Sequence, residues 1–561
     1  MNTKRSSRSR LRVLSLVAGS LTLGGCASTL TDHLKTDGPG AQIFEGMGAH
    51  QRTMTTDSPE AQEYFGQGVA WMYAFNHDEA IRSFAGAAKL DPESAMAWWG
   101  IALCEGPNYN DAVMTEERSA AAWGALQEAR ARIDNTTPLE RALIEALTAR
   151  YADPWPEDRT ELEQAYADAM AEVWAEYPDD SDVGVLYAEA MMVQRPWMLY
   201  SIAGEPEGDT LHIVATIEQV MEMDPGNPGA AHLYIHAVEP SLDPGRATAA
   251  ADRLRGQMPG AGHLNHMPSH IYVQVGEWDK AVKQNLDAMT VDDHYRTLSP
   301  DQGLQHMYMV HNAHMLAYSA MMVGREAEAM EAARAMWSDV PEEMMAGVAP
   351  FIDLWMTSVY DVQKRFGRWD AILAEPAPPE FLRITTAGWH AHRAVAFAAK
   401  HDFEGAAREH AEFRRVKDAM PADAVFYGDP VLRILEVSDL FIEGEIALQK
   451  DELERAAELL EKAVDVEVSL AYGEPPQWLQ PTRHTLGAVY LKAGRFEDAE
   501  RVYRADLAKW RGNGWSLYGM SRALAGQGKT AEAQDFERQH KVAWAEADEP
   551  TTTSCKCIPD A

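Results

Sequence analysis

The sequence predicts an all-α solenoid, a stack of antiparallel helix pairs, on three observations. The chain has 561 residues, which is too long for one compact core and favours several domains or an elongated repeat. No stretch sustains the apolar–polar alternation of a half-buried strand. Similar residues instead return at a spacing of about 34 residues, which is typical of helical repeats that stack on their neighbours.

The first repeat begins at Ala61. Counted from that residue as position 1, large side chains fall at positions 4, 11 and 24, small ones at 8 and 20, and a proline at 32. These residues are Tyr64, Trp71, Phe84, Gly68, Ala80 and Pro92. Small residues let two antiparallel helices approach closely, large ones fill the seam between them, and the proline ends the second helix. We therefore expect helix pairs from residue 58 onward.

The same register returns along the chain, in counts that start at Pro228, Gly262, Val310, Gln480 and Gly514. Its members there are Ala247, Ala251, Pro259, Tyr272, Gly276, Ala281, Ala317, Ala329, Pro341, Gly487, Tyr490, Ala499, Tyr503, Leu524, Gly528 and Ala533. This pattern resembles the tetratricopeptide repeat (TPR) family over most of residues 58–545, with irregular units at 95–160, 346–420 and 430–465. The resemblance implies a TPR-type helical solenoid. The phrases YAFNHDEAIRSF, AMAWWGIAL, YIHAVE, HMPSHIY and NGWSLYG are similar to secreted bacterial TPR lipoproteins without an assigned activity.

The first residues indicate where in the cell the protein is located. A basic start leads into the apolar stretch VLSLVAGSLTL, which is too short to span a bilayer, and then into Leu23-Gly24-Gly25-Cys26. This order resembles a bacterial lipoprotein signal, and an ordinary secretory peptide is the alternative. The resemblance implies that residues 1–25 are removed, that Cys26 carries lipid and that the protein is anchored in the bacterial cell envelope. By the same resemblance, Ser28 two positions after Cys26, rather than an aspartate, implies the outer membrane, facing the periplasm.

Composition divides the remaining chain into four parts. Residues 26–57 lack periodicity and are predicted to be a flexible tether after the lipidated cysteine. Two TPR-like solenoids follow at 58–345 and 346–545, and residues 546–561 form a polar tail with the motif CKC. Cys555 and Cys557 in that motif suit a disulfide, a soft-metal clamp or a redox pair. Cys104, in an apolar phrase, is expected to be buried.

The charge of the chain is strongly negative, at −36, and removal of residues 1–25 with their five basic side chains would lower it to −41. An acidic field of this size repels nucleic acid and anionic lipid and attracts cations or basic partners. We therefore exclude DNA and RNA as ligands.

Histidines are concentrated in one stretch, and they follow the repeat register. Nine of the nineteen fall between His232 and His314, and seven of these occupy positions 2, 5 and 9 of three repeat units. They are His232, His236, His263, His266, His270, His311 and His314, and Glu239 follows at position 12. These positions form a stripe roughly 130° from the seam. In TPR proteins that stripe lines the concave groove, so the resemblance implies a histidine-lined ligand groove.

Histidine is the commonest metal ligand, and residues on neighbouring helices can meet at one ion. We therefore expect these histidines and Glu239 to hold a transition-metal ion: zinc, copper or iron. A polar, aromatic or pH-sensitive ligand groove is the alternative. Glu239 suits a fourth ligand, an orienter of a ligating histidine or a general base for a metal-bound water.

Several nearby residues are assigned other roles. Pro268, inside the predicted helix, is expected to break or kink it. His306 falls nearer the seam, His294 is expected in a turn, and His484 is expected on the surface. Tyr234 and Tyr272 fall at seam positions and are predicted to be core residues, whereas Tyr318 falls on the groove stripe.

Two functions fit this pattern. The first is an envelope-anchored scaffold that binds a protein or peptide in its concave groove and a metal ion on its histidines. The second is a metal-dependent enzyme that uses the same cluster, with Glu239 as the candidate base and an unknown reaction. The sequence has no nucleophile elbow, phosphate-binding loop, dinucleotide fingerprint or H-E-x-x-H motif.

Overall fold

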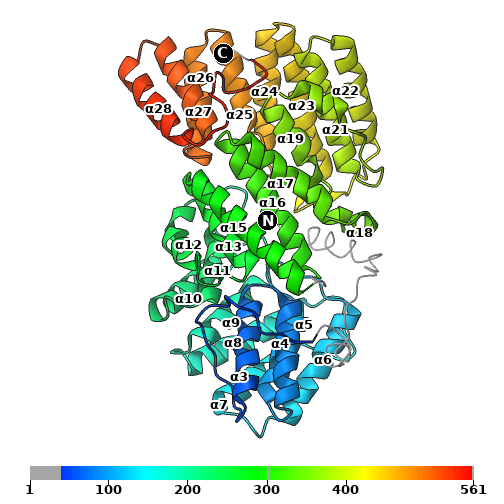
Figure 1. Cartoon of the computed structure of the whole chain (residues 1–561), viewed down its shortest axis with the longest axis vertical. Helices are drawn as coiled ribbons and strands as arrows, with labels where there is room; N and C mark the ends of the chain where they lie inside the picture. The colour runs from blue at the N-terminus through cyan, green and yellow to red at the C-terminus, as the bar shows by residue number, and fades with distance from the viewer. Residues whose placement is uncertain (1–39, 300–302, 559–561) are drawn as a thin grey trace, which may run out of the picture. The chain divides into compact units, whose positions relative to one another are not determined.

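In the computed structural model, residues 40–299 and 303–558 are described, and almost all of their regular structure is helical. The chain divides into an N-terminal unit, Ala27–Asn312, and a C-terminal unit, Ala313–Ala561. In each unit, helices that follow one another in sequence pack against one another, as Figure 1 shows for α21 to α28. The fold is therefore the predicted all-α, TPR-type solenoid. In the described part of the chain no helix combines the length and apolar character needed to cross a membrane.

The N-terminal unit contains helices α3 to α15 and the first part of α16. Their bounds are α3 Pro59–Tyr73, α4 His77–Leu90, α5 Ala95–Glu105, α6 Glu116–Ala131, α7 Pro138–Thr148, α8 Thr160–Glu176, α9 Ser181–Met192, α10 Thr210–Met223, α11 Pro228–Val238, η1 Pro244–Ala247, α12 Thr248–Leu254, α13 Gly262–His266, α14 Pro268–Val275, α15 Trp278–Leu298 and α16 Gln305–Met322.

The C-terminal unit contains the rest of α16, helices α17 to α28 and one short antiparallel ladder. Their bounds are α17 Glu326–Asp339, α18 Glu342–Ile352, η2 Trp355–Thr357, α19 Ser358–Arg365, α20 Trp369–Ala374, α21 Arg383–Ala399, α22 Phe403–Asp418, β1 Val425–Phe426, β2 Asp429–Pro430, α23 Val431–Gln449, α24 Leu453–Glu467, α25 Thr482–Lys492, α26 Phe496–Lys509, α27 Gly514–Gly526 and α28 Thr530–Ala543.

Local sequence explains where helices begin. Ser58 accepts a hydrogen bond from the backbone of Ala61 just before α3, and Asn227 does the same for Ala230 before α11. A proline follows each cap at the first helical position, where a missing N–H costs nothing. Each such cap stabilises its helix by about 1 kcal/mol.

Small residues allow the predicted close approach of helices. A Cβ on Gly68 of α3 or Gly100 of α5 would lie 2.5 or 2.7 Å from the ring of Phe84. The two glycines therefore let Phe84 of α4 fill the seam between the helices. The same arrangement recurs around Tyr503 in the C-terminal unit, where Cβ atoms on Gly487 and Gly519 would lie 2.3 and 2.2 Å from its ring.

The boundary between the units differs from the one predicted at residue 346: it falls inside α16, between Asn312 and Ala313. Asn312 donates a hydrogen bond of 2.7 Å to Asp292 of α15, which holds the first part of α16 to the N-terminal unit. Further along α16, the carbonyl of Met321 accepts a bond of 2.8 Å from the Trp515 indole of α27. Periodicity marks one continuous helix here and cannot show that its two parts have different neighbours.

The predicted tether is wrong for residues 40–57. Phe44 and Met54 are buried, and Arg52 donates hydrogen bonds to Asp180 and Asp182, 2.9 and 3.0 Å away. This segment lacks periodicity because it is irregular and packs through contacts with residues far away in sequence. Residues 1–39, including the predicted signal and Cys26, lie outside the described residues.

Candidate metal centre

Four helices of the N-terminal unit bring six histidines together. They are His232 and His236 on α11, His263 and His266 on α13, His270 on α14, and His311 on α16. Within each pair His232–His236 and His266–His270, the residues are four positions apart, so both rings lie on one side, one turn apart. Pro268 separates α13 from α14 as predicted, because it has no N–H to continue the hydrogen-bond ladder.

The cluster is buried, which corrects the expectation that these histidines line an open groove. His232, His236, His263, His266 and His270 are each no more than 2% exposed, and His311 is half-buried. Aromatic rings from other elements cover the cluster: Phe75 lies 4.4 Å from His232 and Tyr308 lies 4.5 Å from His263, between ring centroids. Both distances are those of packed rings.

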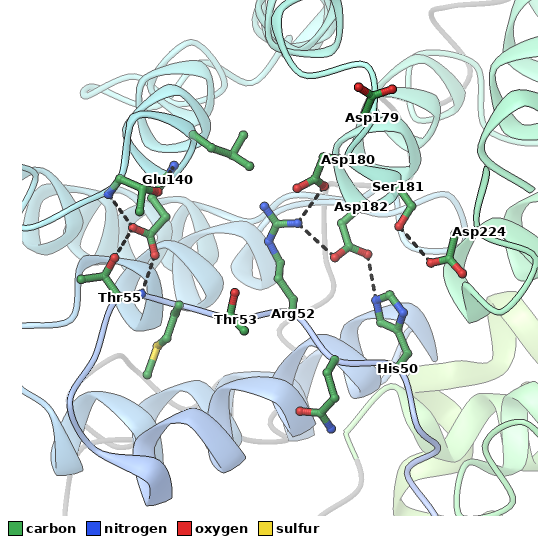
Figure 2. A pocket seen from close by; sticks show the side chains of 14 residues that line it. His50, Arg52, Thr53, Thr55, Glu140, Asp179, Asp180, Ser181, Asp182 and Asp224 are labelled. Atoms are coloured by element: carbon green, nitrogen blue, oxygen red, sulfur yellow. Dashed lines mark hydrogen bonds and ion pairs between the residues drawn. The ribbon is translucent and has the colours of Figure 1, made fainter.

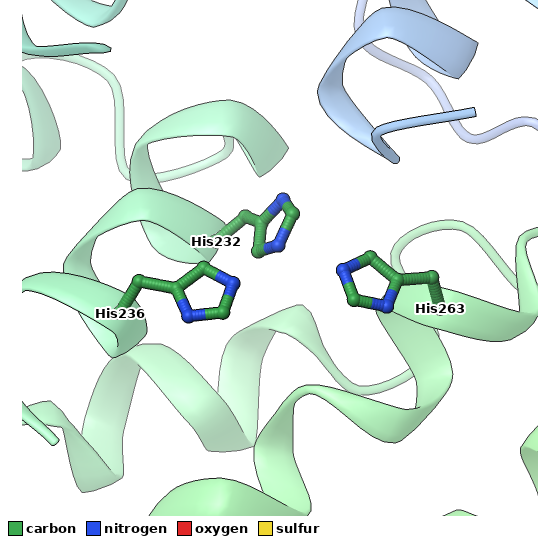
Figure 3. Close-up of side chains that lie close together, drawn as sticks. All are labelled: His232, His236 and His263. Atoms are coloured by element: carbon green, nitrogen blue, oxygen red, sulfur yellow. The ribbon is translucent and has the colours of Figure 1, made fainter. Parts of the chain in front are cut away.

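The first triplet consists of His232, His236 and His263. Figure 3 shows the three rings converging from α11 and α13. One nitrogen from each lies within 4.8 Å of the others, and ring centroids are 5.0 Å apart for His232–His236 and for His232–His263. Three imidazole nitrogens at this spacing form a possible ligand set for one transition-metal ion.

The second triplet consists of His266, His270 and His311, whose ligand nitrogens also lie within 4.8 Å of one another. The closest contact is between His266 Nε2 and His270 Nε2, 2.6 Å apart. The two triplets are adjacent, since ring centroids are 6.0 Å apart for His263–His266 and 5.8 Å apart for His236–His270.

The other nitrogen, Nδ1, of four of these rings contacts a fixed oxygen. His236 and His270 contact the two carboxylate oxygens of Glu239, at 2.9 and 2.7 Å. His232 contacts the backbone carbonyl of Tyr73 at 2.7 Å, and His266 contacts the side-chain oxygen of Asn285 at 2.6 Å. Such contacts orient the ring and leave Nε2 with the lone pair, as is usual behind metal-ligating histidines.

The electrostatics favour neutral rings. Burial, reinforced by neighbouring histidines, lowers the pKa of His232, His263 and His266 well below 6.5. A neutral imidazole has the lone pair that metal coordination requires. Among the described residues, His232 Nε2 and both ring nitrogens of His263 have no hydrogen-bond partner, and a buried unpaired polar atom costs about 1–3 kcal/mol.

Three aromatic residues near the cluster could not be assigned from the sequence. Phe75 and Trp197 have backbone φ of +55° and +62°, a strained conformation that costs on the order of 1–3 kcal/mol and is often found at functional sites. Trp197, 44% exposed, contacts both Tyr109 and His236, at 5.1 and 5.5 Å between centroids. Trp197 therefore lies between the buried cluster and solvent. Nothing in its local sequence indicates this.

His314 belongs to neither triplet. It lies in the C-terminal unit, buried beside Trp355 at 5.3 Å between centroids, and burial lowers its pKa to about 3. Its register position matches that of His232 and His266, but its part of α16 packs in the other unit. His306 is half-buried on the same helix, outside both triplets.

Other predicted positions have mixed outcomes. His294 is exposed on α15 rather than in a turn, and His484 is fully buried rather than on the surface, because Asp506 contacts it at 2.9 Å. Tyr318 is buried against Trp510 and does not face a groove. The predicted burial of Tyr234, Tyr272 and Cys104 is confirmed.

The tail folds back onto the C-terminal unit. Cys555 and Cys557 form a disulfide and are buried beside Glu445, with an oxygen of Glu445 within 4.8 Å of both sulfurs. Burial raises the pKa of Glu445 to about 8. Of the three roles predicted for Cys555 and Cys557, namely a disulfide, a soft-metal clamp or a redox pair, the structure has the disulfide. Within the predicted polar tail, Thr553, Ser554, Cys555 and Cys557 are buried.

A polar cavity of about 470 Å³ lies elsewhere in the N-terminal unit, beside the packed segment 40–57 (Figure 2). Its charged lining groups are largely paired with one another: Arg52 with Asp180 and Asp182, His50 with Asp182, and Glu140 with Thr55. These pairs attach residues 40–57 to α7 and α9. The charged groups that line the cavity therefore make structural contacts.

Comparison of the sequence with known protein families matches one segment of the chain. Residues 482–514, which span α25 and α26, match the profile of the tetratricopeptide repeat. This segment is a tetratricopeptide repeat. A search among curated protein sequences gives no significant match.

Solved structures give weak matches over most of the chain. The human IFIT1 dimer with PPP-AAAA is 12% identical, with 88% of this chain and 92% of that chain covered and a TM-score of 0.30. Cut9 in the Cut9–Hcn1 hetero-tetramer of the APC/C is 13% identical, with 90% and 77% covered and a TM-score of 0.29. Yeast Tom70 is 11% identical, with 86% and 90% covered and a TM-score of 0.25. At these scores the matches have no bearing on ligand or partner.

Proposed function

We propose that the N-terminal unit binds a transition-metal ion on buried histidines, within a TPR-type scaffold of a kind suited to binding. The observation that carries this proposal is the convergence of His266, His270 and His311, whose ligand nitrogens lie within 4.8 Å of one another, with His266 Nε2 and His270 Nε2 in direct contact. The hydrogen bonds behind the two rings determine what can occupy that contact.

His266 donates from Nδ1. Its partner, Asn285, donates its own amide nitrogen to the carbonyl of Ala281 at 2.8 Å, so the amide oxygen is the atom that faces His266. His270 faces a carboxylate oxygen of Glu239 through Nδ1 and donates to it. Both Nε2 atoms then present lone pairs to each other, an arrangement that a shared cation would relieve.

The cation is either a proton or a metal ion. Burial lowers the pKa of His266 well below 6.5, which disfavours a proton on that ring. His311 supplies a third nitrogen to the same point, which a shared proton does not need and a metal ion does. An all-imidazole set suits zinc, copper or iron.

Glu239 is best explained as an orienting residue. Both of its carboxylate oxygens contact histidine Nδ1 atoms, and the side chain is 1% exposed. A general base needs an oxygen within reach of the proton that it removes. The alternative function, a metal-dependent enzyme with Glu239 as base, is therefore less well supported than metal binding, and we assign no reaction.

Elemental analysis of the purified full-length protein, expressed with ample zinc, copper and iron, tests the proposal. We expect stoichiometric metal in the unmodified protein and less in the double variant His266→Ala/His270→Ala. His294→Ala is the matched control, because His294 is exposed on α15 outside the cluster. Less than a tenth of an equivalent in the unmodified protein would exclude a bound metal and leave the proton as the shared cation.

We also propose that the protein is anchored to the cell envelope through lipid on Cys26, and that its scaffold recruits a protein or peptide. The first proposal is supported by the order of basic, apolar and Leu-Gly-Gly-Cys segments. The second is supported by the repeat architecture, which offers extended binding surfaces. Metabolic labelling with a fatty acid, compared between the unmodified protein and Cys26→Ser, tests the anchor: equal labelling would exclude it.

A further inference from the structure

We infer that the cluster binds two metal ions, one on each histidine triplet, with Glu239 orienting one ligand of each ion. This inference rests on the proposed function and specifies its stoichiometry. It begins with the distance limits of a single site. Metal–nitrogen bonds are about 2 Å long, so ligand atoms of one ion lie within about 4 Å of one another. The histidine nitrogens that approach this limit fall into the two triplets, which share no member.

The first triplet has the character of a ligand set in its own right. His232 is fully buried, and its Nδ1 donates to the carbonyl of Tyr73, so the lone pair is on Nε2, which has no protein partner. His263 is 2% exposed, and neither of its ring nitrogens has a protein partner. Since no group in residues 40–299 and 303–558 satisfies these buried nitrogens, their convergence (Figure 3) is explained by a cation that they bind.

Glu239 couples the two sites. One carboxylate oxygen contacts His236 of the first triplet and the other contacts His270 of the second. A third possible ligand group consists of His236, Glu239 and His270. We interpret it as one carboxylate that orients a ligand of each ion, and not as a third ion site. A single residue that fixes one ring of each triplet sets the two sites at a defined separation.

Each ion would have three protein ligands and an open coordination position, as in catalytic rather than structural zinc sites. Two neighbouring ions with open positions suit a small bridging ligand, of which hydroxide or another small anion is the simplest. Phe75 and Tyr308 pack against the rings, so such a ligand would bind in largely apolar surroundings. Trp197, 44% exposed, contacts His236 and lies on the solvent side of the first triplet.

Metal counting separates this inference from the proposed function. The full-length protein is stripped with a chelator, reloaded with zinc alone, desalted and analysed. We expect two equivalents in the unmodified protein and in the His294→Ala control. We expect one equivalent each in His232→Ala/His263→Ala and in His266→Ala/His311→Ala, because each pair removes two ligands of one triplet. Circular dichroism checks that the variants keep their helices.

The outcomes are distinct. No zinc in the reloaded unmodified protein, together with no zinc, copper or iron in the elemental analysis of the purified protein, overturns both proposals. One equivalent in the unmodified protein, lost in either double variant, leaves the metal function standing and overturns the two-ion site.

A measurement on the unmodified protein covers the case in which a variant does not fold. Loaded with Cu(II), adjacent ions broaden each other's electron paramagnetic resonance signal. We expect the signal per copper at two equivalents to be broader or weaker than that at one, because neighbouring ions couple. An unchanged line width with an integrated signal that doubles from one to two equivalents would overturn the two-ion site.

Discussion

Two sets of buried histidines, one in each unit, are stabilised differently. In the C-terminal unit, His392, His410 and His484 each face an aspartate, at 3.0, 2.6 and 2.9 Å. In the N-terminal unit, His232, His263 and His266 have no carboxylate contact, and their rings face other histidines. A histidine paired with its own aspartate is stabilised by that acid, whereas buried histidines that face one another would gain from a shared cation. The comparison therefore separates structural histidines from candidate ligands.

The largest expected effect is on stability, at the aspartate that pairs with His484 in the C-terminal unit. Asp506 accepts hydrogen bonds from His484, Ser516 and Asn513, all buried. Asp506→Ala leaves these donors unsatisfied, so we expect the free energy of unfolding to fall by about 3–5 kcal/mol. Urea denaturation measures it. Asp498→Ala is the control on the same helix, because its ion pair with Arg495 is at the surface and is worth about 0–1 kcal/mol. A loss no larger than the control's contradicts the structural role.

In the histidine cluster, substitution of a buried histidine is expected to raise the free energy of unfolding instead of lowering it. In metal-free protein, His263→Leu removes two buried ring nitrogens that have no protein partner. It should therefore raise the free energy of unfolding by about 1–3 kcal/mol, whereas His484→Leu should lower it. Hydrogen exchange of α13 and α14 reports the first change, and that of α25 the second. Destabilisation by both substitutions in chelator-treated protein would remove the distinction between the two kinds of histidine.

Substitution of Glu239 tests its role behind the ligands. In Glu239→Gln one oxygen is replaced by an N–H donor, which cannot accept from a histidine Nδ1–H. Loss of such an orienting contact usually weakens metal binding by about 10–100-fold, and competition with a chelator measures it. Glu222→Gln, exposed on α10, serves as the control. An unchanged affinity would mean that the rings are oriented by packing alone.

The smallest effect is a change of slope with pH. Burial lowers the pKa of His263 well below 6.5, so below pH 6.5 the unfolded chain binds a proton that the folded chain does not. Its contribution is therefore unfavourable, and stability falls as pH falls, by about 1.4 kcal/mol per pH unit for one histidine. In metal-free protein, the difference in free energy of unfolding between His263→Leu and the unmodified protein should therefore grow by this amount per pH unit as the pH falls from 6.5 to 5. Parallel stability curves would refute a neutral buried His263.

The sequence was informative where the contacts are local. The register placed Gly68 and Gly487 at helix crossings, and position 5 located His232 and His266 in the cluster. The same position placed His484 on the surface, which is wrong, because Asp506 is supplied by the next helix. The covering of the cluster by Phe75 and Trp197, and the bonds to Tyr73 and Asn285, depend on residues that only the tertiary fold brings near. The packing of residues 40–57 depends likewise on Asp182, 130 residues from Arg52.

Trp197 provides an optical signal for the cluster. Its indole lies 5.5 Å from the ring of His236 and is 44% exposed, so a paramagnetic ion at the first triplet would lie close enough to quench its fluorescence. The difference in emission between the unmodified protein and Trp197→Phe isolates this one indole from the other fifteen of the sixteen tryptophans. Occupancy of the buried centre can then be followed in solution as it fills and empties, without a label.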